Sequence, residues 1–86
     1  MYAIELSNRV VKFLTKLDKK TRERIEERLK NLSAQPHPSD AKFIYRENNS
    51  MILRYRIGDY RALYKVNEDK KVILIAKIDK RERVYQ

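Results

Sequence analysis

The stretch LRYRIGDYRALYK, residues 53–65, contains two runs in which apolar and polar side chains alternate, separated by Gly58 and Asp59. Alternation with a period of two is typical of a β-strand with one buried face, and a two-residue loop that begins with glycine favours a type II′ hairpin. Numbering outward from the loop predicts one face made of apolar or aromatic pairs: Ile57 with Tyr60, Tyr55 with Ala62, Leu53 with Tyr64, and Met51 with Val66. We expect this face to form the core.

The opposite face of the predicted hairpin gathers positive charge. On it Arg56 faces Arg61, Arg54 faces Leu63, and Ile52 faces Lys65. Like charges that are directly opposed across two strands destabilise a sheet by a few tenths to ~1 kcal/mol. Such a face becomes favourable when a polyanion supplies the missing negative charge. Alternation along the last strand puts Lys77, Asp79 and Arg81 together, and if these three share the face of the arginines, Arg81 extends the same patch.

The rest of the chain predicts a single α+β domain over residues 1–86. Residues 2–6 alternate weakly, as in a short strand, and Ser7 and Asp18 are suitable N-caps for two helices with apolar residues at helical spacing. The second helix should run from Lys19 to about Ser33 and end before Pro36. Strands are expected at residues 42–46, 51–57, 60–66 and 71–79. Both helices should pack on one face of a mainly antiparallel sheet, with the last strand central.

The composition favours some functions and excludes others. The chain has 21 Lys and Arg against 12 Asp and Glu, a net charge of +9, which is typical of proteins that bind nucleic acid or an acidic partner. A highly charged surface selected for heat stability is an alternative explanation. The absence of cysteine excludes disulfides and zinc–thiolate sites. The longest apolar run, residues 72–76, is too short to span a bilayer, so we expect a cytoplasmic protein without a membrane partner.

Few residues of the sequence are of the types that usually act as general acids, general bases or metal ligands in enzymes. His37 is the single histidine and lies between two prolines, so we expect it to be solvated. No metal-binding or phosphate-loop motif is visible, and we expect neither a metal nor a cofactor. An arginine cluster can nevertheless hold a phosphodiester and stabilise the charge that develops when a ribose 2′-OH attacks it. Exposed tyrosines at positions 45 and 85 could stack on single-stranded bases.

Two segments, LRYRIGDYRALYKV (53–66) and NEDKKVILIAKIDKRERVY (67–85), together with an element order β-α-α-β-β-β, resemble the RelE family of toxins. The most specific pieces are GDYRALY and KRERVY, and the resemblance covers nearly the whole chain. It implies a toxin of a type II toxin–antitoxin system that enters the ribosomal A site and cleaves mRNA there without a metal, using the 2′-OH as nucleophile. It also implies a RelB-like antitoxin, with operator DNA bound only by the toxin–antitoxin complex.

The resemblance also implies roles for individual residues. Arg61 matches a phosphate-binding arginine, Arg81 matches an arginine of the transition state or leaving group, and Tyr85 matches a tyrosine that orients the substrate. Arg54 stands where relatives carry a catalytic lysine, but an arginine, with a pKa above about 12, is a poor general base. Further contacts to mRNA or ribosomal RNA are expected from the remaining basic residues of this region, which are Arg56, Lys65, Lys77, Lys80 and Arg83.

Two alternatives stay open. A ParE-like toxin of the same fold would inhibit DNA gyrase by binding and would cut nothing. Arg61 with Arg81 and Tyr85 favours the RNA-cutting branch, whereas Ile52 and Arg54 at lysine positions argue for the other. The residues alone also permit a basic RNA-binding module without catalytic activity.

Overall fold

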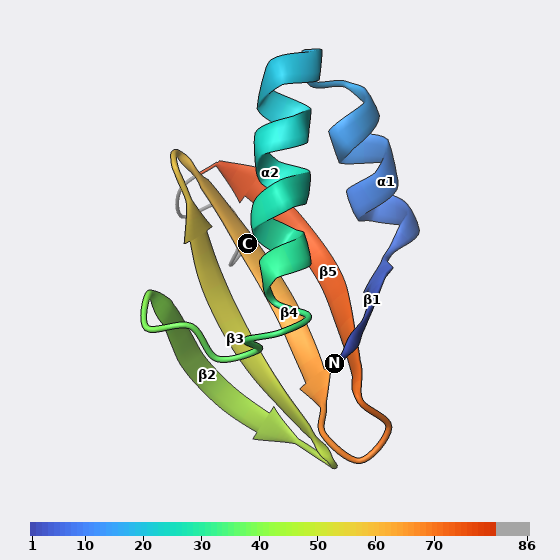
Figure 1. The fold of residues 1–86 in the computed structure, drawn as a ribbon, viewed down its shortest axis with the longest axis vertical. Helices are drawn as coiled ribbons and strands as arrows, with labels where there is room; N and C mark the ends of the chain where they lie inside the picture. Colours follow the sequence, from blue (N-terminus) through green and yellow to red (C-terminus); the bar gives the residue numbers. More distant parts are fainter. Residues whose placement is uncertain (81–86) are drawn as a thin grey trace.

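The computed structural model describes residues 1–80 and contains two helices and a five-stranded sheet (Figure 1). The elements are β1 (Ala3–Leu6), α1 (Asn8–Thr15), α2 (Lys19–Asn31), β2 (Ala41–Glu47), β3 (Ser50–Ile57), β4 (Tyr60–Asn67) and β5 (Val72–Lys80). Strand order in the sheet is β1-β5-β4-β3-β2, with β1 parallel to β5 and the other neighbours antiparallel. The predicted α+β class is confirmed.

Two details of the predicted arrangement need correction. The order β-α-α-β-β-β is one strand short, because all five stretches predicted as strands do form strands. The last strand, β5, is internal but not central. It lies between β1, at one edge of the sheet, and β4, which is the middle strand.

The β3–β4 hairpin has the register that the two-residue loop predicts. Every expected pair occurs, including Ile57 with Tyr60 on one face and Arg56 with Arg61 on the other. Gly58 has a φ of 59°, and Asp59 is not among the residues with positive φ, as a type II′ turn requires. A Cβ at Gly58 would also lie 3.2 Å from Nη2 of Arg24, so the end of that side chain would have to shift slightly to admit a larger residue.

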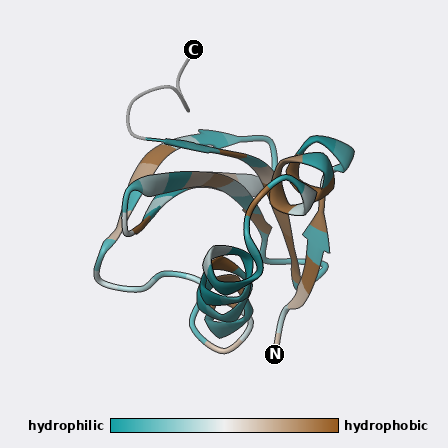
Figure 2. Cartoon of the chain, turned by 90° about the horizontal axis from the view of Figure 1, so that it is seen from above, coloured by the Kyte–Doolittle hydropathy of each residue, from teal (hydrophilic) through white to brown (hydrophobic). Residues whose placement is uncertain are grey.

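The core lies between the two helices and one face of the sheet. Figure 2 shows apolar segments of the helices turned toward the sheet and polar ones turned outward. The buried cluster comprises Val10, Leu14, Ile25, Leu29, Leu32, Leu53, Tyr55, Ile57, Tyr60, Ala62, Tyr64, Val66, Ile73, Ile75 and Ile78. Full burial of a large apolar side chain contributes ~1.5–3 kcal/mol. Since the helices cover this face, the opposite face of the sheet is the one open to partners.

Ser7 joins three elements where β1 ends. Its Oγ accepts a hydrogen bond from the backbone N–H of Val10 (3.2 Å), which is the predicted N-cap of α1. The same hydroxyl donates to the carbonyl of Ala76 in β5 (2.9 Å). Ser7 therefore ties the start of α1 to a strand 69 residues further along the chain.

A β-bulge at Ala76 changes which side chains of β5 face the core. Leu63 pairs with Lys77 while its neighbour Tyr64 pairs with Ile75, so Ala76 is the extra residue. Beyond the bulge, Ile78 enters the core, and Lys77 turns to the face that carries Arg61. Lys77 and Asp79 therefore share the face of Arg61 because of a bulge that the alternation of the sequence did not predict.

Asp18 provides the predicted cap of α2. Its Oδ2 accepts a hydrogen bond from the backbone N–H of Thr21 (3.1 Å). Hydrogen bonding by the side chain of Thr21, and secondly by this N–H, lowers the pKa of the Asp18 carboxyl. No helix within residues 1–80 is long and apolar enough to cross a membrane.

Candidate nucleic-acid interface

Four basic side chains meet on the open face of the sheet. Lys42 of β2 is the cross-strand partner of Arg54 in β3, and Arg56 of β3 is the partner of Arg61 in β4. Together with Asp40 they line a hollow of about 310 Å³. We call this the arginine hollow. Four cations against one carboxylate leave it with a clear excess of positive charge.

The one carboxylate of the arginine hollow is already paired from the other side. Nη2 of Arg28 in α2 lies 3.1 Å from Oδ2 of Asp40. Nε of Arg28 donates to the hydroxyl of Tyr55 (3.0 Å), and its guanidinium lies 5.1 Å from the centroid of that ring. These three contacts fix the position of the Arg28 guanidinium, which compensates the negative charge of Asp40 at the rim of the hollow.

Arg56 and Arg61 have donors available for a ligand. Within residues 1–80, neither guanidinium forms an ion pair. Nε of Arg56 donates to the carbonyl of Gly58 and Nη1 of Arg61 to that of Tyr60, both at a long 3.4 Å. A guanidinium carries five N–H donors in a fork that matches a phosphate. Arg56 and Arg61 can therefore bind one phosphodiester together, each guanidinium donating hydrogen bonds to it.

Asp79 is the cross-strand partner of Arg61 on the other side of β4. Its Oδ1 accepts a hydrogen bond from the backbone N–H of Lys80 at 2.7 Å, which engages the carboxylate locally. Asp79, the acidic residue paired with Arg61 in the sheet, is therefore hydrogen-bonded within its own strand.

The structure divides the predicted contact residues into two groups. Arg54, Arg56 and Arg61 lie together, and Lys77 shares their face. Nζ of Lys65 instead lies 3.0 Å from Oε1 of Glu47, so its charge is compensated. Lys80 is the partner of Tyr60 and lies over that ring (5.8 Å to the centroid), on the helix-covered face and away from the hollow.

Among the tyrosines, Tyr45 is available for base stacking and Tyr64 is not. Tyr45 is 49% exposed and is the partner of Ile52 on the open face, where a bulge in β2 brings it. Tyr64 is buried, its hydroxyl donates to the carbonyl of Pro36 (2.8 Å), and burial raises its pKa. Tyr64 is therefore a structural group.

Arg81, Arg83 and Tyr85 lie outside the described residues, so their expected roles stay predictions. Sequence reasoning missed Lys42, Asp40 and Arg28. Lys42 could have been found from the register across the turn at residues 47–50, whereas the approach of Arg28 depends on how α2 packs on the sheet, which no local pattern reveals.

Comparisons with known proteins identify the family to which the chain belongs. A family model described as the ParE toxin of the type II toxin–antitoxin system parDE matches residues 4–85. A candidate toxin RelE1 from Methanocaldococcus jannaschii is 31% identical over 86 residues, which covers 99% of this chain and 96% of that protein. The toxin in an archaeal RelE–RelB complex from Pyrococcus horikoshii superposes with a TM-score of 0.86 at 34% identity, covering 95% of this chain and 97% of that one.

A more distant structure shares the fold alone. In the RelBE2 toxin–antitoxin complex of Mycobacterium tuberculosis, the matching chain has a TM-score of 0.76 at 24% identity, with 93% of this chain and 98% of that chain covered. Since the family match spans nearly the whole chain and the archaeal relatives exceed 30% identity, the protein belongs to the RelE/ParE superfamily of toxins from type II toxin–antitoxin systems.

Proposed function

We propose that this toxin is a RelE-type endoribonuclease that cleaves mRNA in the ribosomal A site and so stops translation. The observation that carries the proposal is the direct pairing of Arg56 with Arg61 inside the arginine hollow. The arrangement costs stability in the empty protein, and a bound phosphodiester offsets that cost. Tyr45 is exposed on the same face, where its ring can stack on a base.

The reaction we propose is a transesterification. As the ribose 2′-oxygen attacks phosphorus, its proton passes to solvent water with the assistance of Tyr85; the 5′-oxygen of the next nucleotide leaves and takes up a proton, and the products are a 2′,3′-cyclic phosphate and a 5′-hydroxyl. Arg61 holds the phosphate, and Arg54 supplies charge rather than acting as a base, because its pKa is too high. Arg81 protonates or stabilises the leaving oxygen, and Tyr85 orients the substrate. Neither a metal nor a cofactor takes part.

The proposed partners follow from the same function. The RelE–RelB complex of Pyrococcus horikoshii supports a RelB-like antitoxin for this chain as well. We expect an acidic antitoxin whose affinity falls with added salt, since the open face is basic. Operator DNA is bound through the complex, and the toxin acts on ribosomes in the cytoplasm.

Primer extension tests the proposal. The wild-type protein, Arg61→Ala, and a control Lys70→Ala are added to translating ribosomes, and mRNA 5′ ends are mapped. Lys70 lies in the exposed turn between β4 and β5, away from the hollow. New ends in the A site with wild type and control, but not with Arg61→Ala, are the expected result. Intact mRNA in all three reactions would refute the endonuclease.

A second candidate is inhibition of DNA gyrase. The matching family model carries the description of a ParE toxin, and Ile52 with Arg54 departs from the lysines of RelE relatives. A supercoiling assay separates the two functions: gyrase inhibition together with intact mRNA would support the ParE-like activity.

A further inference from the structure

The first helix has a charge distribution unlike that of the second. Asn8 to Lys16 contains Arg9, Lys12 and Lys16 and no acidic residue, and all three basic side chains are exposed. In α2, three glutamates lie among the basic residues and reduce the local charge. Arg9, Lys12 and Lys16 form no ion pair within the described part of the chain. This positive charge is not explained by the arginine hollow.

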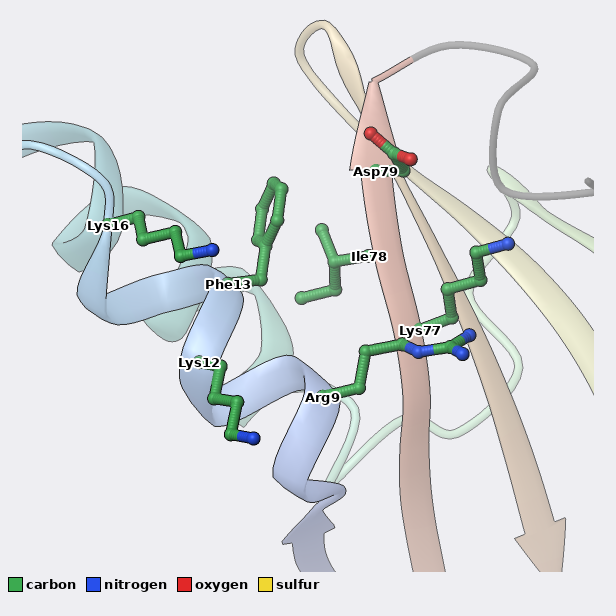
Figure 3. Close-up of a pocket in the computed structure, with 7 residues that line it drawn as sticks. All are labelled: Arg9, Lys12, Phe13, Lys16, Lys77, Ile78 and Asp79. Carbon is green, nitrogen blue, oxygen red and sulfur yellow. The ribbon is translucent and has the colours of Figure 1, made fainter.

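These residues border a groove of about 600 Å³ between α1 and the end of β5 (Figure 3). Its lining consists of Arg9, Lys12, Phe13, Lys16, Lys77, Ile78 and Asp79. Ile78 extends from β5 toward Phe13 of α1, and Arg9, Lys12 and Lys16 project from the helix side, whereas Lys77 points to the other side of β5. We call this the α1–β5 groove.

The topology leaves the groove open. β1 pairs with β5 only as far as Ile75, and the carbonyl of the bulged Ala76 is occupied by the hydroxyl of Ser7. From Lys77 onward, β5 therefore has no β1 partner, and its edge faces α1 across the groove. The edge would be covered if β1 were longer, so the short first strand makes the site.

The α1–β5 groove is continuous with the arginine face. Lys77 and Asp79 line the groove, and they are also the cross-strand partners of Leu63 and Arg61. Neighbouring strands lie only about 4.8 Å apart, so one strand separates the groove from the residues around Arg61. A ligand that extends from the hollow by a few nucleotides crosses β5 and reaches α1.

We propose that the α1–β5 groove binds a second stretch of RNA backbone, next to the nucleotides held in the arginine hollow. The inference rests on the proposed function and adds a docking site to it. Arg9, Lys12 and Lys16 follow each other along one side of α1 over about 10 Å, at 1.5 Å per residue, and so present a row of charges. A row of lysines acts as point charges on successive phosphates. Continuity with the phosphate-binding face favours RNA over an acidic peptide.

The test compares two variants that lose the same charge. Lys12→Gln with Lys16→Gln removes two cations from the groove. Lys30→Gln with Lys70→Gln removes two exposed cations that line neither the groove nor the hollow. Both are titrated with a labelled 2′-O-methyl RNA of about 20 nucleotides, which cannot be cleaved, between about 50 and 200 mM salt. Circular dichroism verifies that both variants are folded.

For single strands, each lost phosphate contact lowers the salt slope by about 0.7, so the groove variant should lose about 1.4 and the control much less. Affinity at about 100 mM salt should fall roughly tenfold for the groove variant only. Equal slopes in the two variants would overturn the inference. Loss of binding to a polyglutamate peptide with an unchanged RNA slope would overturn it too, and would assign the groove to a protein partner.

Failure of the proposed function gives a different result. If the wild-type protein leaves A-site mRNA intact, the endonuclease activity is refuted, yet the difference in salt slope still measures RNA binding by the α1–β5 groove. If wild type and both variants cut A-site mRNA with equal efficiency at limiting toxin, the endonuclease stands and the docking role is refuted.

Discussion

Arg56 and Arg61 are direct cross-strand partners one pair away from the Gly58–Asp59 loop, and the short loop fixes their register. The two guanidinium groups therefore cannot separate by sliding one strand along the other. A like-charge pair held in this way is a local cost of up to ~1 kcal/mol in the ligand-free protein.

The first prediction follows from that cost. Arg56→Thr should raise the free energy of unfolding by a few tenths to ~1 kcal/mol at low salt, because it removes the repulsion and introduces a good strand former. The gain should shrink as salt screens the pair. Urea denaturation at two salt concentrations measures it. Arg46→Thr, which removes a cation opposite Met51, is the control and should not show the same salt-dependent gain.

The second prediction concerns Arg28 and Asp40. Arg28→Gln should cost ~1–3 kcal/mol of stability, because the contacts to Asp40 and Tyr55 are lost. It should also weaken RNA binding several-fold, since Asp40 is then free to pair with cations of the arginine hollow. Adding Asp40→Asn should restore the affinity without restoring the stability. A double variant that binds RNA as poorly as Arg28→Gln would contradict this explanation.

The third prediction concerns the hydroxyl of Ser7. Ser7→Ala should lower the free energy of unfolding by ~1–2 kcal/mol, because the cap of α1 and the hydrogen bond to Ala76 are lost together. Ser7→Thr keeps a hydroxyl and should lose much less. Thermal unfolding monitored by circular dichroism compares them, and equal losses would show that the hydroxyl is not what matters.

The fourth prediction is a pH dependence. Burial raises the pKa of Tyr64 above its ordinary value of 10.0, so the folded state keeps a proton that the unfolded state releases. This contribution to stability is fully present below pH 10.0 and is lost as the pH rises beyond it. Tyr64→Phe should therefore flatten the decline in stability above pH 10.0 in alkaline urea titrations. An unchanged decline would show that other groups cause it.

The hairpin was the most predictable part of the fold and of the site. Its two-residue loop and strict alternation define the register without help from the rest of the chain, which is why Arg54, Arg56 and Arg61 could be placed together. The two N-caps, Ser7 and Asp18, were equally local.

The features that sequence patterns could not predict depend on packing between segments that are far apart in the chain. The bulge at Ala76 leaves no mark in the apolar run of β5, yet it decides that Ile78 faces the core and Lys77 the open face, instead of the reverse. The contact between Arg28 and Asp40 depends on the position of α2, and the α1–β5 groove depends on where β1 stops.

The pairing of Ala3 with Val72 also affects how the chain folds during its synthesis. Synthesis proceeds from the N-terminus, so β1 and both helices leave the ribosome before β5, the strand to which β1 and the cap at Ser7 attach. Contacts between segments so far apart form slowly, because a long loop must close first. A nascent chain interrupted before residue 72 lacks β5, so β1 has no partner in the sheet and α1 lacks the strand on which it packs. We therefore expect such an incomplete chain not to form the complete toxin fold, because the strand that joins β1 and the cap at Ser7 to the rest of the sheet is missing.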